Sequence, residues 1–177
     1  MTMTLPASTP APASSASLDP ILRVIVAIVG AIEGLGGLTD LSILLNDMST
    51  IPGTSPGGVI IIASIILHPI LGFAALGLAL ARRLRYGITA LALLVLTQWC
   101  SDMPSVINHG IGLTGNAFVV TMTVLKILVQ PALALLAIAA AWFNRHLALA
   151  AVAVMLPTIV DAASVAAFAV GVFIHGF

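Results

Sequence analysis

The chain has 177 residues, of which 60% are hydrophobic and 7% are charged, and its formal net charge at pH 7 is zero. This composition excludes an ordinary soluble domain and is typical of an integral membrane protein. The balanced charge provides no basic face for nucleic acid, and the single cysteine excludes an intramolecular disulfide and a cysteine-rich metal site.

Residues 1–20 differ from the rest of the chain. This segment, MTMTLPASTPAPASSASLDP, is rich in Ala, Pro, Ser and Thr and contains no Lys or Arg. A secretory signal peptide would begin with a basic region. The composition instead predicts a disordered tail, followed by one transmembrane domain over residues 21–177.

Five apolar stretches follow the tail, and each is close to the length of about 20 residues that a helix needs to cross a bilayer. They cover residues 21–45, 59–81, 86–103, 117–143 and 147–174. Lipid cannot satisfy the unpaired backbone groups of an open sheet, and the stretches lack the alternating pattern of a membrane barrel. The sequence therefore predicts an all-α integral membrane protein, a bundle of five transmembrane helices.

The arginines predict how this bundle is oriented. Arg23 opens the first stretch, ARRLRYG joins the second to the third, and NRH joins the fourth to the fifth. The connections NDMSTIPGTSPGG and SVINHGIGLTGN contain no Lys or Arg. Because positively charged loops stay in the cytoplasm, we expect a cytoplasmic N-terminus and an external C-terminus. The expected location is the plasma membrane, as a multi-pass protein of a bacterial inner membrane.

A weak repeat relates the helices that run outward. In each of them an arginine precedes an aspartate by 16 or 17 positions. The pairs are Arg23 and Asp40, Arg85 and Asp102, and Arg145 and Asp161. At a rise of about 1.5 Å per residue, each aspartate falls in the outer half of a bilayer core about 30 Å thick.

The helices that run inward share a second mark. His68-Pro69 and Gln130-Pro131 occupy similar depths, so residues 68–106 and 130–165 look like two copies of one hairpin. Many membrane transporters are built from duplicated units whose polar sites meet near the middle of the bilayer. Chance is the alternative explanation, because similar helix lengths alone produce similar spacings.

Lys126 is the one basic residue that the orientation rule leaves unexplained. A charge at the centre of a bilayer helix costs at least about 2.5 kcal/mol, so a compensating partner is expected. The lysine side chain leans toward the outer end of its helix, where the aspartates are predicted to lie. We expect one polar site in the outer half, with Asp161 as the partner of Lys126. Its predicted members are Glu33, Asp40, Asp102, Lys126, Gln130 and Asp161.

The charge balance of this site suggests its function. One cation facing as many as four acids favours proton or cation coupling, because like charges in a low dielectric cannot all stay ionised. We therefore expect a small carrier or channel-like protein, and a homodimer would enclose more volume than five short helices alone. In the alternative interpretation, Lys126 and one aspartate form a structural lock. The chain is then an accessory or structural subunit of a larger membrane complex, and it docks through small-residue faces such as DAASVAAFAVG.

His68 is a separate candidate in the middle of the second helix. A histidine there can be a proton relay, a haem ligand or a hydrogen-bonded packing residue. The haem interpretation, a membrane redox protein, lacks a second histidine at a matching depth. No cofactor or metal is predicted, and the sequence has no nucleotide-binding or hydrolase motif that would indicate an enzyme. The expected partner is membrane lipid.

Overall fold

The structure is a computed structural model, and it describes residues 18–46, 55–111, 113 and 117–175. The described residues contain helices and no strand, which confirms the all-α class. The helices are α1 (Leu18–Asn46), α2 (Pro56–Leu80), α3 (Leu84–His109), α4 (Ala117–Val124), a π-helical turn η2 (Leu125–Val129), α5 (Gln130–Trp142) and α6 (Leu147–His175). Residues 18–20 belong to α1 and not to the expected tail, whose remaining residues lie outside the described ranges.

Four segments within the described ranges are long and apolar enough to cross a membrane. They are Asp19–Asn46, Pro56–Leu80, Leu84–His109 and Val120–Trp142. The last combines the end of α4 with η2 and α5, and α3 continues to His109, beyond the predicted end at residue 103. In α6, Leu147–Ala163 is a shorter apolar segment.

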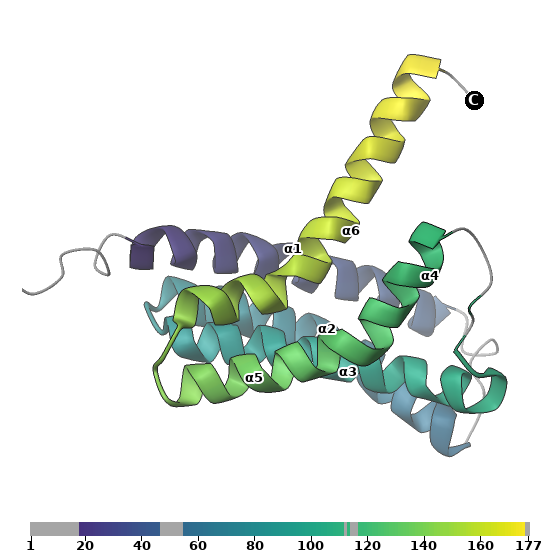
Figure 1. Cartoon of the computed structure of the whole chain (residues 1–177), viewed down its shortest axis with the longest axis horizontal. Coiled ribbons are helices and arrows are strands. Elements are labelled where there is room, and N and C mark those ends of the chain that lie inside the picture. Colours follow the sequence, from purple (N-terminus) through teal and green to yellow (C-terminus); the bar gives the residue numbers. More distant parts are fainter. Residues whose placement is uncertain (1–17, 47–54, 112, 114–116, 176–177) are drawn as a thin grey trace, which may run out of the picture.

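The core lies between α1, α2, α3, α5 and the first half of α6, which run side by side in one bundle (Figure 1). Its largest fully buried side chains are Val26, Ile88, Leu91, Leu94 and Val154. The second half of α6 bends away from the bundle (Figure 1), and the helix contains Pro157. A proline inside a helix removes one backbone hydrogen bond and favours such a bend.

Glycines let α1 and α2 touch backbone to backbone. A Cβ atom on Gly30 would lie 2.7 Å from the backbone nitrogen of Leu76, and one on Gly37 would lie 2.6 Å from the nitrogen of Pro69. A Cβ atom on Gly72 would collide with the backbone of Gly34. Small residues at a membrane helix crossing permit this close approach, which fixes how residues 33 and 68 face each other.

The repeat expected from the sequence has a structural counterpart in the turns after α2 and α5. Arg83 N–H donates to the Leu78 carbonyl at 2.8 Å, and Arg145 N–H donates to the Ala140 carbonyl at 2.9 Å. Arg82 and Asn144, one residue earlier in each turn, have φ of 59° and 52°. These are the bonds and the left-handed residue of a Schellman motif. The two turns are 62 positions apart in the sequence.

The buried faces of α2 and α5 follow the same register. Gly72, Ala75 and Ala79 are buried in α2. The residues 62 positions later in α5 are Ala134, Ala137 and Ala141, and they are buried as well. The helices end at Leu80 and Trp142, again 62 positions apart. The structure thus relates α2 and the turn after it to α5 and the turn after it, which is part of the repeat expected between residues 68–106 and 130–165.

Candidate functional site

Glu33 connects three helices through its carboxylate. It lies near the middle of α1, and its Oε2 atom is 2.8 Å from Nε2 of His68 on α2. Its other oxygen, Oε1, accepts a hydrogen bond from the Thr158 hydroxyl on α6. Only 13% of each side chain of the Glu33–His68 pair is exposed. A carboxylate and an imidazole therefore share a largely buried position in the centre of the bundle.

The surrounding sequence explains why these groups meet. Gly37 lies one turn beyond Glu33, and a Cβ atom there would be 3.0 Å from Cδ2 of the His68 ring. The glycine thus leaves room for the imidazole at the crossing of α1 and α2. Thr158 directly follows Pro157 in α6, and its side chain is buried.

Asp40 extends the cluster toward the exposed surface. It lies two turns beyond Glu33 on α1, and its Oδ2 is 4.0 Å from Nδ1 of His68. This distance exceeds a hydrogen bond, so the interaction is electrostatic. The Asp40 side chain is 54% exposed. The imidazole of His68 therefore lies between a buried carboxylate and an exposed one.

Lys126 belongs to a second cluster, and its partner is not the one expected from the sequence. Its Nζ atom is 2.9 Å from Oδ2 of Asp102 on α3. The prediction of Asp161 as its partner was therefore wrong. Asp161 is exposed on α6 and forms no ion pair with any described residue. The outward bend of α6 (Figure 1) explains the error, because depth along a helix does not fix its lateral position.

The six residues predicted to form one site thus take part in different contacts. Glu33 and Asp40 flank His68, whereas Asp102 pairs with Lys126. Gln130 donates its backbone N–H to Leu125 in the π-helical turn, and its side chain forms no hydrogen bond to the described residues. Sequence reasoning treated His68 separately and missed Thr158, although a hydroxyl directly after Pro157 in an apolar helix was an available signal.

The Glu33 cluster combines a carboxylate, an imidazole and a hydroxyl group. A neutral imidazole has one donor nitrogen and one acceptor nitrogen, and it gains a second donor when protonated. Nε2 of His68 faces the Glu33 carboxylate, so haem ligation through this nitrogen would require breaking the pair. No protein-family model, curated protein or solved structure matches this chain.

Proposed function

We propose that this chain is a small multi-pass membrane carrier or channel-like protein whose transport is coupled to a proton bound between Glu33 and His68. The observation that carries the proposal is the 2.8 Å contact between these side chains near the middle of their helices. Ionisable groups inside a membrane domain are costly, and they mark ion and proton pathways in transporters.

The order of the groups supports a direction for proton movement. Asp40 is the exposed member, His68 lies between it and Glu33, and Glu33 contacts the buried Thr158. The imidazole accepts a proton on Nδ1 from the exposed side and releases one from Nε2 to the buried carboxylate. This transfer would bring a proton from the surface to the point where α1, α2 and α6 meet.

Charge balance separates this cluster from the pair at Lys126. Two carboxylates face one imidazole in the Glu33 cluster, so the cluster can gain a proton and become more nearly neutral. Lys126 and Asp102 already balance each other one to one. We therefore assign coupling to Glu33, His68 and Asp40, and a structural role to the Lys126–Asp102 pair.

The five-crossing arrangement is part of the same proposal. α6 would form the fifth crossing, with the N-terminus in the cytoplasm and the C-terminus outside, because the arginines collect at one end of the helices. The proposed location is the plasma membrane of a bacterium, that is, its inner membrane. A homodimer would shield apolar residues on the projecting half of α6, such as Val165, Val170 and Phe173, which are exposed.

The same exposed half of α6 favours one alternative function. An accessory subunit would use this apolar segment to dock onto a larger membrane complex, and the polar contacts would then act as structural locks between helices. The two functions differ in whether Glu33 takes up a proton. An electrical measurement of proton binding therefore distinguishes them.

The test is a pH jump applied to proteoliposomes adsorbed on a solid-supported membrane. A proton that enters a site near the middle of the bilayer moves charge across part of it, so a transient current arises even without a transported solute. We expect such a current for the unmodified protein and a current at least tenfold smaller for Glu33→Gln. The glutamine keeps an oxygen acceptor for Thr158 but cannot bind the proton.

The matched control is the double variant Lys126→Met with Asp102→Leu, which removes the other charge pair and should keep the current. Parent and variants must show the same folded fraction by size-exclusion chromatography. An unmodified protein with no current above that of protein-free vesicles overturns the proposal. An undiminished current in Glu33→Gln would also overturn it.

A further inference from the structure

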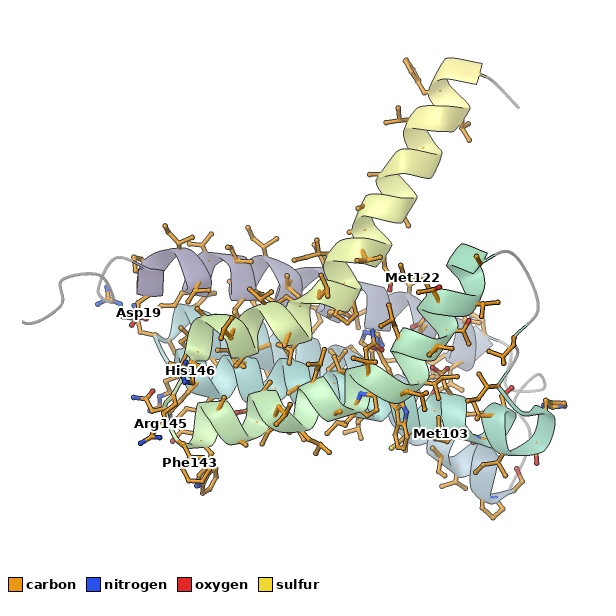
Figure 2. The ribbon with its side chains drawn as sticks, viewed as in Figure 1. Asp19, Met103, Met122, Phe143, Arg145 and His146 are labelled. Atoms are coloured by element: carbon orange, nitrogen blue, oxygen red, sulfur yellow. The ribbon has the colours of Figure 1, made fainter. Side chains whose placement is uncertain are left out.

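A cavity of about 510 Å³ opens at the end of the bundle where α1 begins and the turns after α2 and α5 meet. Figure 2 shows Asp19, Phe143 and Arg145 at this end. The cavity is far richer in positive than in negative side chains. Its charged lining consists of Arg23, Arg82, Arg83, Arg85 and Asp19.

The single acid neutralises only part of this charge. Asp19 lies 3.6 Å from Nη2 of Arg23 in an exposed i,i+4 pair. The Nε atom of Arg23 is buried and has no hydrogen-bond partner among the described residues. Arg85 stacks over the ring of Tyr86 and donates to its hydroxyl at 2.8 Å. The lining therefore keeps a surplus of guanidinium donors, one of them held in place by an aromatic ring.

Arg82 occupies a backbone conformation that does not suit it. Its φ of 59° places it in the left-handed region, where the Cβ atom is unfavourable and glycine is the usual residue of a Schellman turn. The equivalent position in the turn after α5 is Asn144, a residue type that tolerates this region better. A strained arginine facing a cavity indicates a role for its side chain.

We propose that this cavity binds a phosphate group. Guanidinium groups match phosphate oxygens with paired hydrogen bonds, and the volume lies within the range of small-ligand sites. The phosphate could belong to an anionic phospholipid or to a soluble phosphate compound. Trp142 is 80% exposed at the end of α5, and tryptophan is enriched at the level of lipid headgroups in membrane proteins.

The test measures ligand binding to the purified full-length protein by isothermal titration calorimetry in a neutral detergent. The probes are short-chain phosphatidylglycerol, short-chain phosphatidylcholine and inorganic phosphate. We expect binding of phosphatidylglycerol or inorganic phosphate, with an affinity at least tenfold lower for Arg83→Gln. Binding of phosphatidylglycerol alone assigns the site to a lipid headgroup. Competition by inorganic phosphate assigns it to phosphate itself.

Arg145→Gln is the matched control, because Arg145 carries the same charge at the same end but does not line the cavity. The affinity of Arg145→Gln for phosphatidylglycerol or inorganic phosphate should stay within twofold of that of the parent protein. Arg82→Gly serves as a second cavity variant, because glycine relieves the left-handed strain and should keep or raise the melting temperature while weakening binding. Equal losses in Arg145→Gln and Arg83→Gln overturn the proposal, as does the absence of phosphatidylglycerol and phosphate binding.

Discussion

The indole Nε1 of Trp99 donates a hydrogen bond of 2.8 Å to the backbone carbonyl of Ile127. In a regular α-helix this carbonyl would accept the N–H of residue 131, which is a proline and has none. Trp99 on α3 thus satisfies a carbonyl in η2 that the proline leaves open. The Lys126–Asp102 pair joins the same two elements, so two polar contacts hold α3 against the π-helical turn.

Replacing Trp99 with phenylalanine tests this pairing. Trp99→Phe should lower the free energy of unfolding by roughly 1 to 3 kcal/mol, because the Ile127 carbonyl loses its donor in an apolar setting. Pro131→Ala restores a backbone N–H at residue 131. Trp99→Phe should therefore lower the free energy of unfolding by less in the Pro131→Ala background. A double-mutant cycle measured by denaturation should give a coupling energy of at least about 0.5 kcal/mol. Additive effects would show that the two features are independent.

A second prediction concerns the Lys126–Asp102 pair. Lys126→Met should destabilise the protein by less than the about 3 to 5 kcal/mol typical of a fully buried pair, because the lysine side chain is 54% exposed. Adding Asp102→Leu should restore the unfolding midpoint to near that of the parent, since no unpaired carboxylate remains. The control, Lys126→Met with Asp161→Leu, should stay as unstable as the single variant. Recovery in this control instead would point to Asp161 as the partner.

These contacts show how far sequence reasoning reaches for this chain. The helical class follows from segments such as Pro56–Leu80, which are long and apolar enough to cross a bilayer. The choice of partner for Lys126 does not follow, because it depends on how each helix is rotated and bent. η2 changes the rotation of the chain at Lys126, and α6 bends outward before its end. Neither the π-helical turn nor the bend produces a hydrophobic pattern that can be recognised in a single sequence.

The contact between Glu33 and His68 could not be predicted from the sequence either, although both residues were candidate site residues. Its cause is the close crossing of α1 and α2 at Gly37 and Pro69. Glycines are frequent in membrane helices for many reasons, so their presence alone does not identify which helix they face. The turn after α2 illustrates a similar limit, because Arg82 takes a position where glycine would be expected.

A third prediction tests the orientation of the helices and the role of α6. A reporter fused after Arg83 should be cytoplasmic and one fused at Phe177 should be external, because positively charged loops of membrane proteins generally stay in the cytoplasm. Alkaline phosphatase and green fluorescent protein fusions give opposite signals in the two compartments. A cytoplasmic signal at both sites would mean that α6 does not cross, leaving the four segments that are long enough on their own.

The last prediction compares two adjacent glycines of α1. A Cβ atom on Gly37 would lie 2.6 Å from the backbone nitrogen of Pro69, whereas one on Gly36 would have no heavy atom within 4 Å. Gly37→Ala must therefore push α1 away from α2, at a cost of roughly 1 to 3 kcal/mol. Gly36→Ala should be neutral or stabilise the helix by up to about 1 kcal/mol, because alanine is the better helix former.

The same pair of variants connects the helix crossing to the proposed coupling site. Separation of α1 and α2 should lengthen the Glu33–His68 contact, so Gly37→Ala should also reduce the pH-jump current, and Gly36→Ala should leave it unchanged. Both variants add one methyl group to neighbouring positions of one helix, so differences in expression or insertion are minimised. Unfolding midpoints and currents measured on the same preparations decide the result. Equal behaviour of the two variants would contradict the close crossing on which the geometry of the site depends.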